Sequence, residues 1–189
     1  EVFKFVKGEG NRTAIIDLLK GELNQNENPW QSVNYIESHD DFTFIDRLSG
    51  GNEQDKDQVR DETAKASMFA IIIVLLSPGV PMLSAGQDFF RNKNGMRNTY
   101  RSGDLNALQY KSSEMFFKYT RRIRELIEFR QSERGSFLRP INRNDCDYSE
   151  WTESPDGIIG LFVEERQSGR KLMIVLNSII QNIQIKLPN

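Results

Sequence analysis

The sequence is short of the residues that form covalent or metal cross-links. Its 189 residues include one cysteine, Cys146, and one histidine, His39. A single cysteine excludes an intrachain disulfide framework, and one histidine without clustered cysteines makes a zinc centre a weak interpretation. The sequence therefore neither requires nor excludes an oxidising compartment.

Strong net charge and long apolar runs are also absent. The formal net charge is −2, which gives no electrostatic case for binding nucleic acid or an anionic membrane surface. The most apolar run, Met68–Leu76, is far shorter than the roughly 20 residues of a bilayer span, so we expect a buried helix. The start, EVFKFVKGEG, lacks the apolar segment of a signal peptide. The compartment (secreted, periplasmic or cytoplasmic) stays open.

The pattern predicts two regions, an α/β part over 1–134 and an all-β part over 135–189. In the first part, buried strands are expected at Val33–Ile36 and Val80–Ala85, joined by a helix from Asp55 or Asp57 to about Leu76. A strand–helix–strand order predicts a parallel pair with a right-handed crossover.

Further elements follow from local signals. Asn11 and Gly21 bracket a predicted helix, Thr13–Lys20, and a second helix is expected from Ser112 or Ser113 to about Arg130. Residues 1–10 fit a short strand or a loop. Turn signals separate five candidate antiparallel strands, at Phe137-Leu138, Tyr148–Thr152, Ile158–Glu165, Lys171–Asn177 and Asn182–Leu187.

A cluster of ionisable residues follows the first predicted strand: Glu37, His39, Asp40, Asp41 and Asp46. The carboxyl ends of parallel strands are where barrels and open α/β sheets place their chemistry. Three interpretations are open at this stage. His39 and Asp40 satisfy one another in a polar loop, or His39, Asp40, Asp41 and Asp46 bind a metal, or the cluster borders a carbohydrate site.

The long segment 86–111 favours the carbohydrate interpretation. It has interleaved polar, aromatic and basic residues, and loops of this length in compact domains are usually functional or disordered. Sugars need carboxylates, aromatic platforms and hydrogen-bonding side chains. The two segments supply this mixture through Tyr35, His39, Asp40, Arg91, Lys93, Asn98, Tyr100, Asp104, Asn106 and Tyr110.

The motif VNYIESHDD resembles the fourth conserved region of the α-amylase superfamily of glycoside hydrolases, where the seventh strand of a (β/α)8 barrel ends in His-Asp. The continuations LLSPGVPMLSAGQDFFRNKNG and NTYRSGDLNALQY are similar to the pullulanase and debranching branch. The resemblance covers 31–135 closely. It implies that 1–134 is the C-terminal portion of a TIM barrel, and that 135–189 is an antiparallel β-sandwich.

The resemblance also implies roles for individual residues. Asp40 would be the carboxylate that binds sugar hydroxyls and stabilises an oxocarbenium-like transition state, and His39 would hydrogen-bond hydroxyls of the same glucosyl unit. Asp41 stands where asparagine is usual, and a second acid there would raise the pKa of its neighbour if buried. Less secure contacts on the acceptor side are Asn98, Tyr100, Asp104 and Asn106.

The function implied is part of a retaining α-glucan hydrolase of the pullulanase type, which cleaves α-1,6 bonds without metal or cofactor. The family's nucleophile and acid/base motifs are not found in the chain, and in family order both lie upstream. The chain alone is therefore expected to be inactive, with an α-glucan and the N-terminal part of the barrel as partners. The alternatives are a non-catalytic glucan-binding or scaffold module, and a transglycosylase of the branching type.

Overall fold

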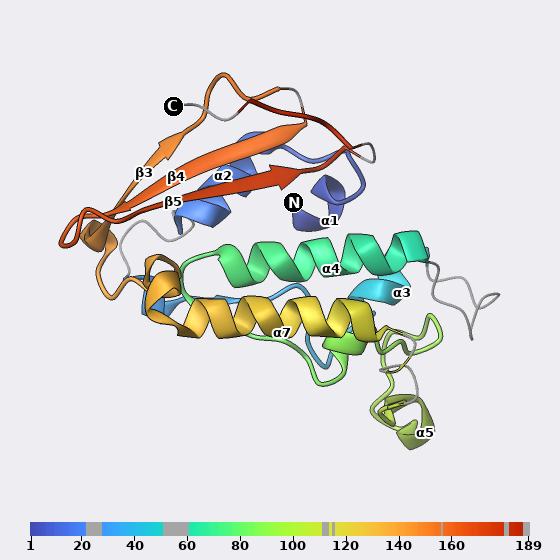
Figure 1. Cartoon of the computed structure of the whole chain (residues 1–189). Coiled ribbons are helices and arrows are strands. Elements are labelled where there is room, and N and C mark those ends of the chain that lie inside the picture. Colours follow the sequence, from blue (N-terminus) through green and yellow to red (C-terminus); the bar gives the residue numbers. More distant parts are fainter. Residues whose placement is uncertain are drawn as a thin grey trace.

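The computed structural model describes residues 1–21, 28–50, 61–110, 114, 116–155, 157–179 and 182–186. It is a mixed α/β arrangement with two small sheets. Figure 1 shows the antiparallel sheet above the helices α4 (Asp61–Leu76) and α7 (Phe117–Gln131). The predicted start of the helix at Asp55 or Asp57 and the predicted caps Ser112 and Ser113 lie outside the described residues.

The first sheet is a parallel ribbon of two short strands. β1 (Val33–Asn34) pairs with β2 (Val80–Pro81), with Val33 opposite Val80. The amide of Val80 donates to the Ser32 carbonyl at 2.8 Å. The predicted parallel pairing is confirmed, but the strands are shorter than predicted and β1 is not buried, because Val33 is 54% exposed.

Two helices carry the apolar core next to the ribbon. α4 (Asp61–Leu76) packs beside α7 (Phe117–Gln131), as Figure 1 also shows. Their apolar faces meet α3 (Phe44–Leu48) in one cluster that includes Ile45, Ile71 and Ile123. The prediction that the apolar end of α4 lies buried between other elements is confirmed, since Ile71, Ile73 and Leu75 are almost fully buried.

The second sheet is antiparallel and has the order β3-β4-β5. Its strands are β3 (Cys146–Glu150), β4 (Ile158–Glu165) and β5 (Lys171–Asn177). The predicted strands at 158–165 and 171–177 are confirmed, and the one at 148–152 starts two residues earlier. The structure gives no strand at 182–186, and 137–138 belong to a 3₁₀ helix, η4 (Glu133–Leu138), so those two predictions were wrong.

The antiparallel sheet packs on the first residues of the chain. α1 (Val2–Phe5) and α2 (Arg12–Lys20) lie between the sheet and α4 in Figure 1. Ile15 and Leu19 share one apolar cluster with Leu161 and Ile174. The predicted ends of α2 are confirmed, because the Asn11 side chain accepts the amide of Thr13, and Gly21 closes the helix with a left-handed conformation. Residues 2–5 are helical rather than a strand or loop.

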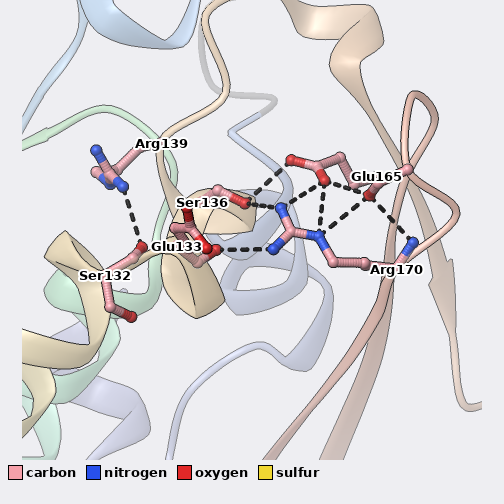
Figure 2. Close-up of polar contacts among 7 residues, drawn as sticks. Ser132, Glu133, Ser136, Arg139, Glu165 and Arg170 are labelled. Carbon is pink, nitrogen blue, oxygen red and sulfur yellow. Dashed lines mark hydrogen bonds and ion pairs between the residues drawn. The ribbon is translucent and has the colours of Figure 1, made fainter.

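Arginine side chains attach the sheet to the helical part. The Arg170 guanidinium donates to Glu165 Oε2 at 2.7 Å, to Ser136 Oγ at 2.8 Å and to the Glu133 carbonyl at 3.0 Å, so the β4–β5 hairpin is tied to η4 (Figure 2). Arg12 of α2 bonds Glu150 Oε1 of β3 at 2.9 Å. The domain boundary between 134 and 135 stays a prediction.

Candidate functional site

His39 and Asp40 lie just beyond the carboxyl end of β1. Their side chains are 90% and 77% exposed, and His39 Nε2 is 3.3 Å from Asp40 Oδ2. The two groups therefore partner each other, as one interpretation of the sequence expected. Most of their polar surface still faces solvent and is open to a ligand.

Asp41 connects this loop to the loop that follows β2. Its carboxylate accepts a hydrogen bond from Arg97 Nε at 2.7 Å, and the Arg97 guanidinium also lies over the Phe42 ring, 5.3 Å from its centroid. Because Arg97 bonds it, the pKa of Asp41 is lowered. Asp41 is exposed, so the condition under which it would raise the pKa of its neighbour is not met.

Beneath this surface pair lies Lys93, which is 1% exposed. Its ammonium donates to the carbonyls of Asp41 and Arg97, at 2.5 and 2.9 Å. Burial lowers the pKa of Lys93. The sequence grouped Lys93 with the sugar-binding side chains, but a buried ammonium that is bonded to two carbonyls cannot contact a sugar in this arrangement.

The buried carboxylate of Asp46 makes the second connection between the two loops. Its oxygens accept the amides of Lys93 at 2.7 Å and Gly95 at 3.0 Å, together with the Thr43 hydroxyl at 2.6 Å. Thr43 caps α3, so the carboxylate joins the start of that helix to the turn at 93–95. Backbone amides and a hydroxyl satisfy Asp46, which assigns it a structural role.

Glu37 is a buried acid at the end of β1. Its Oε2 accepts the amide of Phe44 at 2.5 Å, and Oε1 has no hydrogen-bond partner among the described residues. Burial raises the pKa of Glu37 from 4.5 to about 7, against the attraction of Arg91. The Glu37–Phe44 bond closes the loop that carries His39 and Asp40.

The other predicted sugar contacts lie further along the second loop. Tyr100 is 81% exposed, and Asp104 lies in α5 (Gly103–Asn106), which projects from the helical part in Figure 1. Asn106 is already engaged, because its side chain accepts from Thr99 Oγ1 and donates to the Thr99 carbonyl, both at 2.7 Å. Asn98 follows Arg97 directly, so the Asp41–Arg97 pair brings it towards the His39–Asp40 loop.

Sequence reasoning missed the buried connection between the loops. Lys93 stands in an Asn-Lys-Asn-Gly run that reads as a solvated turn. Both of its partners are backbone carbonyls, and one of them is 52 residues away, so the sequence around Lys93 does not indicate its burial. In the described ranges no group of three or more His, Cys, Asp and Glu side chains is arranged to hold a metal ion, and no described helix is long and apolar enough to cross a membrane.

Comparison with known proteins gives a consistent set of relatives. No family model matches the chain. A pullulanase from Bacillus subtilis (strain 168) is 39% identical over 112 residues, which are 59% of this chain and 15% of that protein. An isoamylase from Flavobacterium sp is 27% identical over 135 residues, which are 60% of this chain and 17% of that protein. The chain thus spans about a sixth of the length of these curated relatives.

Solved structures extend the similarity to nearly the whole chain. A pullulanase type I from Bacillus subtilis str. 168 complexed with maltose is 26% identical, with a TM-score of 0.79, over 94% of this chain and 26% of that one. A pullulanase from Anoxybacillus sp. LM18-11 complexed with maltotetraose superposes with a TM-score of 0.80 over 99% of this chain and 27% of that one, at 23% identity. The second likeness shows the fold alone.

Proposed function

We propose that this chain, which is related to pullulanases and isoamylases of the α-amylase superfamily, forms one edge of the active site of a pullulanase-type α-glucan debranching hydrolase. The observation that carries the proposal is the place of His39 and Asp40. They lie exposed at the carboxyl end of a parallel strand, in a loop that is tied to the loop after the next strand. In barrels this edge is where catalytic residues gather.

In this proposal the Asp40 carboxylate binds sugar hydroxyls and also stabilises the transition state. Glycoside hydrolysis passes through an oxocarbenium-like state, which a nearby carboxylate stabilises electrostatically. The imidazole of His39 hydrogen-bonds hydroxyls of the same sugar. Asn98, Tyr100 and Asp104 extend the contacts along the glucan, and Asn106 supports them by holding the backbone at Thr99.

The rest of the machinery would come from other strands of a barrel. A retaining mechanism needs a nucleophile and an acid/base about 5–5.5 Å apart, and the family motifs for both are missing from this sequence. Exposed apolar side chains on the ribbon support the presence of further barrel strands, which would cover them. These side chains are Val33, Tyr35, Val80 and Met82.

The proposal keeps the predicted division of the chain. Residues 1–134 contribute to the catalytic barrel, and 135–189 to the β domain that follows it. The arginine contacts of Arg12 and Arg170 support a fixed attachment between the two, rather than a free linker. The substrate is an α-glucan, and no cofactor takes part.

Titration calorimetry with maltotetraose, together with a pullulan hydrolysis assay, tests the proposal. We expect the 189-residue chain to bind the sugar and to release no reducing ends from pullulan. Asp40→Asn should weaken binding about tenfold, the size of effect expected when a charged hydrogen-bond partner is lost. Asp147→Asn is the matched control, since Asp147 is an exposed carboxylate that pairs with Arg166 on the antiparallel sheet.

Two outcomes would contradict the proposal. Turnover of pullulan by the purified chain would show that it already holds a nucleophile and an acid. If the Asp40 and Asp147 variants bind maltotetraose with equal affinity, the sugar does not bind at the β1 edge. Binding without turnover, even in a longer polypeptide that includes the upstream residues, would favour the non-catalytic glucan-binding module.

A further inference from the structure

The two loops that carry the proposed site meet around one buried side chain, Lys93. Its ammonium donates to the carbonyl of Asp41 and to the carbonyl of Arg97. Asp41 directly follows Asp40, and Arg97 directly precedes Asn98. The two carbonyls therefore lie next in the chain to Asp40 and Asn98, the proposed sugar-binding residues. The Lys93 side chain sets the distance between the two carbonyls.

The contacts on either side of Lys93 make this connection rigid. Its backbone amide donates to Asp46 Oδ2, and the other oxygen of the same carboxylate accepts the Gly95 amide. On the surface above, Asp41 and Arg97 pair at 2.7 Å. The first loop is thus held at 41 and 46 and the second at 93, 95 and 97, so neither loop shifts without breaking a buried bond.

The arrangement is costly for the fold, which points to a use beyond packing. A buried ammonium loses its hydration, and here two neutral carbonyls replace part of it. Among the described residues no carboxylate forms an ion pair with Lys93. A buried apolar side chain would avoid this cost, whereas only a donor with several hydrogens can hold two carbonyls from separate loops at one point.

We propose that Lys93 is a positioning residue that couples the His39–Asp40 loop to the Asn98–Tyr100 segment. The two segments then contact the same glucan chain at a fixed distance from each other. The inference rests on the proposed function for the identity of the ligand. Lys93 does not touch the sugar, and its effect passes through the carbonyls of Asp41 and Arg97. Asp46 supports it from the other side of the same turn.

Hydrogen exchange in the absence of sugar tests the coupling directly. In Lys93→Met, which keeps the stem and removes the ammonium, we expect peptides covering 37–47 and 91–101 to exchange about tenfold faster together. Peptides from 158–177 in the sheet should be unchanged. Lys65→Met is the matched control, because Lys65 is an exposed lysine that pairs with Asp61 on α4. Faster exchange confined to 91–101 would overturn the coupling.

Asp46→Asn serves if Lys93→Met fails to fold. The NH2 group of the asparagine would face the N–H of Gly95 and cannot accept its hydrogen bond. Part of the connection is therefore lost, while the volume of the side chain stays the same. Joint acceleration of both loops supports the proposal, and acceleration of 37–47 alone contradicts it.

Maltotetraose binding gives the second measurement. We expect Lys93→Met, or Asp46→Asn in its place, to bind about tenfold more weakly, since small displacements of positioned groups have effects of this order or larger. Unchanged affinity with both loops loosened would refute a role in positioning. If the unaltered chain binds no sugar, the proposed function fails, whereas the exchange result still decides whether Lys93 couples the loops.

Discussion

Buried basic side chains hold both ends of the β1–β2 ribbon, and they do so in different ways. At the amino end, the Arg130 guanidinium donates to the carbonyls of Leu75, Ser77 and Gly79 at 2.5, 3.0 and 2.7 Å. All three carbonyls belong to one short segment, which runs from the last turn of α4 to the residue before β2. At the carboxyl end, Lys93 holds two carbonyls that come from different loops.

The amino end of the ribbon is held by contacts that serve stability, whereas the carboxyl end carries the proposed sugar site. Arg130 ends α4 by satisfying carbonyls that a helix leaves unpaired, and a cation is favourable at that end of the helix. Gly79 fits the same junction, because a Cβ there would lie 2.6 Å from Ser32 Oγ. At the amino end, the three carbonyls are hydrogen-bonded and the backbone is closely packed. The carboxyl end instead holds exposed polar groups at fixed separations.

The largest expected effect is the loss of Arg130. Arg130→Met leaves three carbonyls without their donor at a helix end, and each buried acceptor left unsatisfied costs about 1 to 3 kcal/mol. We therefore expect the free energy of unfolding to fall by about 3 to 5 kcal/mol. Urea denaturation followed by circular dichroism measures it. Arg121→Met is the control, since Arg121 is an exposed arginine on the same helix that pairs with Glu125. Equal losses in both variants would refute a special role for the amino end.

The second expected effect concerns Glu37 at the carboxyl end. The pKa of Glu37 is raised from 4.5 to about 7, so the folded protein keeps a proton that the unfolded chain releases. Its contribution to stability is full below about pH 4.5 and is lost as the pH rises to about 7. The loss is about 3 kcal/mol over that interval.

Glu37→Gln isolates this contribution. The amide oxygen still accepts the Phe44 amide, while the ionisable proton is removed. Urea denaturation gives the free energy of unfolding of each protein at about pH 5 and at about pH 8. The decrease between these two pH values should be smaller by about 3 kcal/mol in Glu37→Gln than in the unaltered chain. The same pH dependence of stability in both proteins would mean that burial does not raise the pKa of Glu37.

How far the sequence predicts this molecule depends on the range of the interaction. Asn11 and Gly21 set the ends of α2 through contacts within a few residues, and the apolar run at 158–163, with turn signals on either side of 158–165, is enough to define β4. The helix at 2–5 escaped prediction because it has one turn and is held by packing, with Phe5 against Phe69 of α4. The sequence indicates the β1 edge as a candidate site because its ionisable residues lie close together in the chain.

The supporting contacts of the site could not be predicted in the same way. The Lys93 ammonium reaches the carbonyl of Asp41, and backbone carbonyls leave no mark in a sequence. Asn106 illustrates the same limit, since a residue type suited to sugars turns out to hold the backbone of Thr99. The sequence therefore indicates which residues gather at this edge, but not that Glu37, Asp46 and Lys93 are buried there or which backbone groups they bond.

The most direct test of the account is a map of where a glucan binds. Amide chemical shifts should be followed by nuclear magnetic resonance while maltotetraose is added to the 189-residue chain. We predict shifts concentrated in 38–42 and 96–101, at the carboxyl end of the ribbon, and none at 75–79 around Arg130. Shifts confined to the sheet of β3, β4 and β5, or equal at both ends of the ribbon, would contradict the central claim that this edge holds the sugar.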